Sequence, residues 1–140
     1  MNYAGIDPGF SGAIEFTVYG SPVPQGRPKF YRRGGHVGVY DPVKSKDWKS
    51  EVRWQAIENK VKILEGPLIM NLYFYLPRPK SLPKKVLHHT KKPDVDNLVK
   101  AIKDALRDIC YHDDSQITQL FASKEYGTEP RVEINIVSAE

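Results

Sequence analysis

The chain has 140 residues, of which 40% are hydrophobic, and carries a formal net charge of +4 with a single cysteine. This length suits one domain with one core, and a lone Cys110 excludes an intrachain disulfide. No apolar run approaches the roughly 18 residues of a membrane span, and no basic stretch followed by an apolar core opens the chain. We therefore expect a cytoplasmic protein with no membrane association.

The charges are unevenly distributed along the chain. Four cations occur without an acid from Arg27 to Arg33, and six more from Arg78 to Lys92. The following stretch, Asp94 to Asp114, instead carries six aspartates. Cations attract phosphate and clustered carboxylates hold divalent metals, so this pattern fits a metal-dependent nuclease. Scattered surface charge is the alternative explanation.

The first forty residues predict a strand and a hairpin. Residues 14–19 form a β-branched and aromatic run that is typical of a strand, and the proline-rich stretch 21–28 predicts a loop. Residues 30–33 and 36–40 flank Gly34-Gly35, a pair that tolerates the positive φ angles of a tight turn. We expect an exposed, basic β-hairpin, with Phe30 and Tyr31 packed in the core.

The middle of the chain predicts a helix followed by a central strand. The helix covers roughly residues 43–61 and ends before Gly66-Pro67. Residues 68–76 are almost continuously apolar, which favours a strand covered on both faces. The residues expected on the buried side of the helix are Val43, Trp54, Ile57 and Val61.

The last third predicts a loop over 79–93, a helix from Asn97 to about Ile109, and strands over 117–126 and 131–137. One face of the helix collects the apolar residues Leu98, Ala101, Ile102, Ala105, Leu106 and Ile109. The order of elements predicts an α+β domain over 14–140, with two helices packed on a mixed β-sheet and residues 1–13 as an N-terminal extension.

Two aspartates lie where the predicted loop becomes a helix. In an extended backbone, residues two apart point the same way, so Asp94 and Asp96 can converge on one cation. Paired carboxylates repel each other unless a divalent ion is present, and hard oxygen ligands suit Mg²⁺ or Mn²⁺. The alternative is that either aspartate caps the helix and that Lys100 forms an ordinary ion pair with Asp96.

A second acidic pair, Asp113-Asp114, follows the same helix. A helix from Asn97 to Ile109 is about 20 Å long, so spacing alone does not bring its two ends together. Either the chain folds back beside the helix start, or a second subunit supplies the missing carboxylate. The sequence does not choose between these arrangements.

The segment Lys92-Pro-Asp-Val-Asp-Asn-Leu-Val-Lys-Ala-Ile-Lys-Asp-Ala-Leu106, followed by Asp113-Asp114-Ser-Gln-Ile117, closely resembles the core signature of the RusA family of Holliday junction resolvases. The segments Gly20–Pro28 and Tyr40-Asp-Pro42 resemble the N-terminal part of the same family. The resemblance extends from about residue 15 to 137.

This resemblance implies a site and a mode of action. Asp94, Asp96 and Asp114 match the family's metal-binding catalytic aspartates, and Lys100 matches its functional lysine. Asp113 is also expected at the metal site, which it would help to shape. A symmetric homodimer with Mg²⁺ would place paired symmetric nicks in a four-way DNA junction, in recombination and repair. The expected DNA-binding cations are Arg27, Lys29, Arg32, Arg33, Lys84, Lys85, Lys91 and Lys92, although each could also belong to a solvated loop. Phe30 or Tyr31 could wedge into a junction, but core packing is the preferred interpretation of both.

Two further patterns leave alternatives open. Residues 4–14 resemble the first strand of RuvC-like nucleases of the RNase H superfamily, in which Asp7 would bind metal. No second motif of that superfamily follows, so we do not assign Asp7 to the site. His88-His89 lacks further ligands at suitable spacing, and we expect a solvent-exposed loop there. The other functional alternative is a non-catalytic junction-binding protein whose carboxylates are structural.

Overall fold

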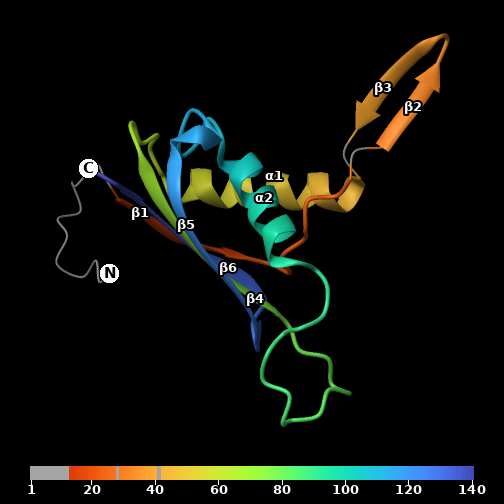
Figure 1. The fold of residues 1–140 in the computed structure, drawn as a ribbon, viewed down its shortest axis with the longest axis vertical. Helices are drawn as coiled ribbons and strands as arrows, with labels where there is room; N and C mark the ends of the chain where they lie inside the picture. The colour runs from red at the N-terminus through yellow and green to blue at the C-terminus, as the bar shows by residue number, and fades with distance from the viewer. Residues whose placement is uncertain (1–12, 28, 41) are drawn as a thin grey trace.

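The computed structural model describes residues 13–27, 29–40 and 42–140. Asp7 and the rest of the predicted extension before residue 13 lie outside the described residues. Figure 1 shows the arrangement of the elements. In chain order they are β1 (Ala13–Tyr19), β2 (Lys29–Arg33), β3 (His36–Tyr40), α1 (Val43–Glu58), β4 (Leu68–Pro77), α2 (Val95–Leu106), the 3-10 helix η1 (Asp114–Gln116), β5 (Ile117–Gly127) and β6 (Arg131–Ser138).

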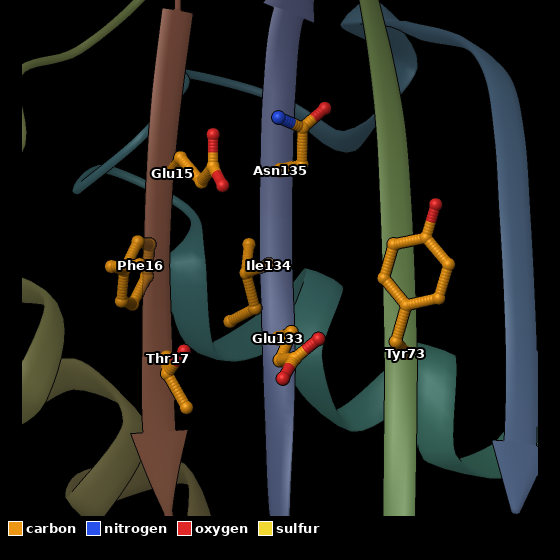
Figure 2. A pocket seen from close by; sticks show the side chains of 7 residues that line it. All are labelled: Glu15, Phe16, Thr17, Tyr73, Glu133, Ile134 and Asn135. Carbon is orange, nitrogen blue, oxygen red and sulfur yellow. The ribbon is translucent and has the colours of Figure 1, made fainter. Parts of the chain in front are cut away.

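A four-stranded mixed sheet in the order β1-β6-β4-β5 forms the centre of the fold. β6 runs antiparallel to both β1 and β4, whereas β4 and β5 are parallel and are connected through α2. Both helices lie behind the sheet in the view of Figure 2 and so cover the same face. The predicted α+β class, with two helices on a mixed sheet, is confirmed.

The strand β4 is central, as predicted, but its two faces differ. Alternate residues from Leu68 to Leu76 are buried toward the helices. Tyr73, on the opposite face, is 36% exposed, and the side chain of Asn71 bonds to Asn135 instead of entering an apolar layer. The prediction of two covered faces is therefore wrong for the described residues, because an aromatic ring with a polar tip and an amide tolerate contact with water.

Helix α1 buries a different face from the one predicted. Val43, Trp54 and Ile57 are 69%, 63% and 55% exposed. The face toward the core consists of Ser45, Trp48, Lys49, Val52 and Ala56. The prediction failed because this face includes Lys49, which pairs with Asp104 of α2. A search for periodic apolar residues does not detect such a charged pair. The helix ends at Glu58, and Val61 packs against the core from beyond it.

Helix α2 agrees with its prediction. Leu98, Ala101, Ile102, Ala105 and Leu106 are all 0% exposed and pack into the core, while Ile109 packs against the core just after the helix. The core places one side of α2 firmly, so the charged residues of the other side are held in a fixed row. Among the described residues, no helix is long and apolar enough to cross a membrane.

Strands β2 and β3 form the predicted hairpin as a separate two-stranded sheet. Gly34 and Gly35 supply the positive φ angles of its turn, at +56° and +81°. Figure 1 shows that the hairpin projects away from the rest of the fold. Phe30 and Tyr31 are 73% and 50% exposed, so their expected core packing is wrong: the projecting hairpin has no core to enter.

Candidate active site

The start of α2 presents two exposed carboxylates. Asp94 is the N-cap residue, with an extended backbone (φ −73°, ψ 145°), and its side chain makes no capping hydrogen bond. Asp96 follows in the first turn, and both side chains are exposed. Capping by Asp94, the ordinary role of an aspartate at this position, is therefore not what this structure shows. The Asp94 carboxylate remains available to a ligand.

The charged side of α2 forms a row. Asp96, Lys100, Asp104 and Arg107 recur at spacings of three and four residues, which places them along one side of the helix. The far end of this row borders a hollow of about 300 Å³. The residues that line the hollow are Gln25, Gly26, Lys49, Lys100, Asp104, Arg107 and Asp114. Lys100 and Asp114 thus share one hollow, which Asp94 and Asp96 do not line.

Asp114 has one satisfied and one unsatisfied carboxylate oxygen. Arg107 Nη2 donates to Asp114 Oδ2 at 3.1 Å, and this hydrogen bond raises the pKa of the guanidinium. Asp114 Oδ1 is buried and has no hydrogen-bond partner among the described residues. A buried carboxylate oxygen without a partner is costly, so this atom is suited to bind a cation or to accept from a donor.

Asp113 plays a different part from its neighbour. Its Oδ1 accepts a hydrogen bond from the Ser115 backbone N–H at 2.9 Å, and this bond holds the pKa of Asp113 below its ordinary value. Gln116 completes a reciprocal capping box by accepting from the Asp113 backbone N–H at 3.0 Å. Asp113 therefore shapes the turn that carries Asp114. The Asp-x-x-Gln spacing is the signal that could have identified this cap in the sequence.

A second missed feature is an ion pair beside Lys100. Lys49 Nζ lies 2.8 Å from Asp104 Oδ2, and the Lys49 side chain is only 5% exposed. Partial burial opposes ionisation of Asp104, but the hydrogen bond and charge of Lys49, helped by Arg107 and Arg53, hold its pKa below the ordinary value. This pair joins α1 to α2 at the wall of the hollow.

The proline-rich segment before the hairpin lies against the start of α2. The backbone N–H of Gln25 donates to Asn97 O at 2.9 Å. Gly26 is packed so closely that an added Cβ would come within 2.6 Å of Pro42 Cγ, which excludes other residues without rearrangement. These contacts place the exposed Arg27 near the hollow.

The predicted DNA-binding cations are all exposed. Arg27, Lys29, Arg32 and Arg33 lie in or before the hairpin, and Lys84, Lys85, Lys91 and Lys92 lie in the loop before α2. The fold uses another cation of this loop structurally, since the Arg78 guanidinium donates to Val86 O and Pro83 O at 2.7 Å.

The histidine pair of this loop differs from its prediction. His89 is buried and its ring contacts that of Tyr126 at a centroid distance of 4.7 Å. Burial, together with the charge of Lys124, lowers the pKa of His89. Only His88 fits the predicted solvent-exposed loop, with 80% of its side chain exposed, because the loop folds back onto the end of β5.

The opposite face of the sheet carries another hollow, shown in Figure 2. Glu15, Thr17, Tyr73, Glu133 and Asn135 border it. Two carboxylates and no cation line this hollow, so it is unsuited to phosphate. Cations line the hollow beside α2 instead, so of the two hollows it suits an anion better.

Within residues 13–27, 29–40 and 42–140, no group of three His, Cys, Asp or Glu side chains is placed to hold a metal ion. The chain after α2 does not return Asp114 to the helix start, because β5 begins beside Leu68 and only later reaches the level of the loop that precedes Asp94. Of the two arrangements left open by the sequence, the described residues do not show the fold-back within one chain.

The comparison with protein families now bears directly on this site. The family model described as "Endodeoxyribonuclease RusA" matches residues 19–137. This chain belongs to the RusA family. RusA membership makes it a nuclease of the Holliday junction resolvase class, acting on branched DNA. The match contains every site residue predicted from the RusA-like motif and begins after Asp7, so the RuvC-like segment lies outside it.

A curated protein is also similar to this chain over most of its length. The chain is 46% identical to "Uncharacterized protein YqaN" of Bacillus subtilis (strain 168) over 134 residues, which cover 88% of this chain and 94% of that protein. The similarity therefore spans nearly the whole of both proteins.

Proposed function

We propose that this RusA-family protein is a Mg²⁺-dependent homodimer that resolves four-way junctions by paired symmetric nicks, in DNA recombination and repair. The observation that carries the proposal is that two aspartates leave carboxylate oxygens unused, one at the start of α2 and one in η1. Asp94 is an N-cap without a capping bond, and Asp114 Oδ1 is buried without a partner among the described residues. Aspartates that only stabilised the helix would make these bonds.

The oxygen atoms of the three predicted aspartates suit the metal, whereas the described residues of a single chain do not bring the three side chains together. Asp94, Asp96 and Asp114 offer hard carboxylate oxygens of the kind that Mg²⁺ or Mn²⁺ prefers. Bound there, the ion would supply polarisation of the scissile phosphate and activation of a water. Asp113 supports this site through the turn it caps. One of its two carboxylate oxygens is already occupied, since Oδ1 accepts from the Ser115 backbone N–H.

The remaining side chains have roles that follow from charge and position. Lys100 lines the same hollow as Asp114, where an ammonium can stabilise negative charge that develops on phosphate. The exposed cations of the hairpin and of the loop before α2 would contact the DNA backbone and orient the junction. Asp94, Asp96 and Asp114 would thus perform the chemistry, and the cations would position the substrate.

The test is cleavage of a labelled synthetic four-way junction beside a linear duplex, with Mg²⁺ or with EDTA. We expect junction-selective paired nicks from the wild type and a loss of at least a hundredfold from Asp94→Asn, with junction binding retained. Asp108→Asn is the matched control, because Asp108 is exposed at φ +66°, a conformation that asparagine also adopts readily. Binding without cutting would favour a non-catalytic junction-binding protein, and cutting that survives Asp94→Asn would direct attention to Asp7.

A further inference from the structure

The chain enters Asp94 through a long irregular segment. Residues 78–94 connect β4 to α2 and contain neither helix nor strand apart from an isolated bridge at His88. In Figure 1 this segment extends away from the sheet before it returns to the start of α2. Connecting segments of this kind are more mobile than the elements that they join, unless other contacts hold them. The position of Asp94 therefore depends on contacts made by the residues just before it.

Helix α2 fixes only one side of Asp94. The backbone N–H of Leu98 donates to Asp94 O at 3.2 Å, and Leu98 itself is fully buried. The residue on the other side, Pro93, has no backbone N–H, so its carbonyl oxygen is the backbone group that can form a hydrogen bond. The group that holds Pro93 O therefore sets the direction from which the chain reaches Asp94.

Lys124 of β5 is that group. Its Nζ donates to Pro93 O at 3.0 Å and to Lys91 O at 2.6 Å. Hydrogen bonds from a charged donor are roughly twice as strong as those between neutral groups. Lys124 is half-buried and extends from a strand that is paired with the central β4, where it lies beside the buried Phe74. The ammonium thus ties the segment before Asp94 to the central sheet.

The neighbours of Lys124 on β5 contact the same segment further from α2. His88 forms a bridge with Glu125, and the ring of His89 lies 4.7 Å from that of Tyr126. Of these three consecutive residues of β5, Lys124 is the one bonded to the last residues before the helix. Among the described residues it forms no ion pair. Its ammonium therefore serves the two backbone carbonyls.

We propose that Lys124 is a positioning residue for Asp94. By holding Pro93 O and Lys91 O, its ammonium sets the direction of the chain that enters Asp94, and with it the orientation of the Asp94 carboxylate toward the metal. This inference rests on the proposed function. Groups that orient a metal ligand typically change metal affinity or activity ten- to a hundredfold when they are removed, so loss of this ammonium should weaken metal binding by about tenfold.

The inference is tested with variants of Lys124 in the full-length protein. Lys124→Met removes the donors and keeps an apolar chain of similar length. It should raise the dissociation constant for Mn²⁺, measured by isothermal titration calorimetry, and the Mg²⁺ concentration for half-maximal junction cleavage, each by about tenfold. The KM for the junction should stay unchanged, because the exposed cations of the loop keep their charges. Lys124→Arg keeps a charged donor and should restore most of the metal affinity.

A double variant separates positioning from a general loss of structure. If Lys124 acts through Asp94, then Lys124→Met added to Asp94→Asn should not lower the Mn²⁺ affinity further, whereas independent effects would add. Lys46→Met removes an exposed charge from α1 and is the charge-matched control, which should bind Mn²⁺ as the wild type does. Should Lys124→Met fail to fold, Lys124→Gln takes its place. This variant keeps a neutral donor on a shorter chain and should still weaken Mn²⁺ binding.

Several results would overturn the inference. One is a folded Lys124→Met that binds Mn²⁺ as tightly as the wild type, and another is a further loss of affinity on top of Asp94→Asn. Weaker junction binding with a reduced salt slope and unchanged Mn²⁺ affinity would instead assign Lys124 to a DNA phosphate. If the wild type binds Mn²⁺ but cuts no DNA, the proposed function fails and the Mn²⁺ measurements still decide the role of Lys124. If it neither binds Mn²⁺ nor cuts DNA, both proposals fail.

Discussion

Arg107 and Asp114 form an ion pair at the end of α2 that binds only one of the two carboxylate oxygens. The guanidinium Nη2 lies 3.1 Å from Oδ2, while the buried Oδ1 has no partner among the described residues. A residue that orients a metal ligand through hydrogen bonding typically changes metal affinity ten- to a hundredfold when it is removed. Arg107 has the contact required for this positioning role.

Replacement of Arg107 by alanine should therefore raise the Mg²⁺ concentration needed for half-maximal junction cleavage, by about tenfold or more. The reason is that Asp114 would lose the hydrogen bond that fixes its orientation. Titration of cleavage rate against Mg²⁺ measures the effect. A lower Mg²⁺ requirement would contradict the positioning role and show that the guanidinium competes with the metal for Asp114.

The two adjacent aspartates should respond differently to the same isosteric change. Asp114→Asn removes a negative charge from the hollow that Lys100 also lines and should abolish cleavage. Asp113→Asn retains an oxygen that can accept from Ser115 N–H and should keep most of the activity. Cleavage rates of both variants at saturating Mg²⁺ provide the comparison. Equal inactivity would assign Asp113 to the metal as well.

The ion pair between Lys49 and Asp104 should stabilise the fold at neutral pH. Removal of one partner of a fully buried pair costs roughly 3–5 kcal/mol. Because 40% of the Asp104 side chain is exposed, Asp104→Asn should cost less, about 2 kcal/mol in the free energy of unfolding. Lys49→Met, which replaces the buried ammonium with an apolar chain of similar length, should cost less than Asp104→Asn. Urea unfolding of the three proteins measures these values.

The same pair predicts a pH dependence. The folded-state pKa of Asp104 is depressed, so its stabilisation is present above the unfolded pKa, near 4, and is lost as the pH falls through the lower folded value. The stability difference between the wild type and Asp104→Asn should thus be largest at neutral pH and shrink below about pH 4. A difference that persists unchanged at pH 3 would indicate that the asparagine disturbs packing instead.

Two matched substitutions test which face of α1 is buried. Ile57 is 55% exposed, whereas Ile102 of α2 is fully buried. Ile57→Ala should change the free energy of unfolding by no more than about 0.5 kcal/mol, and Ile102→Ala should cost about 2–5 kcal/mol. Chemical denaturation measures both values. A large loss of unfolding free energy in Ile57→Ala would support the buried face that the sequence predicts.

The projecting hairpin should contribute to DNA affinity through charge alone. The double variant Arg32→Ala/Arg33→Ala should bind junction and duplex DNA less tightly by a similar factor. It should also reduce the salt slope of log K by about one for each phosphate that the arginines neutralise in the wild type. Fluorescence anisotropy at a series of salt concentrations measures this slope. An unchanged slope would mean that these exposed arginines do not touch phosphate.

Local patterns in the sequence predicted much of this fold. The Gly34-Gly35 turn and the apolar face of α2 are each encoded within a few neighbouring residues, and both are confirmed. The failures involve distant partners. Lys49 is buried because Asp104 lies 55 residues later in the sequence, and His89 is buried because it meets Tyr126.

The candidate site divides in the same way. The RusA-like motif brought Asp94, Asp96, Lys100 and Asp114 to attention through sequence alone. Their spatial relation depends on where β5 leads the chain after Asp114, and no local pattern contains that information. The role of Arg107 likewise follows from a contact that the fold creates, whereas the Asp113 cap has a local signal in the Asp-x-x-Gln spacing.

Helix α2 serves two purposes at once, because its apolar side fills the core and its charged side carries Asp96 and Lys100. The positions of these two charged side chains therefore depend on how tightly Leu98 and Ile102 pack in the core. A slight roll of this helix about its axis would leave the protein folded while swinging both charges out of alignment. Weakened packing beneath α2 would accordingly lower the cleavage activity at temperatures well below the unfolding temperature of the protein.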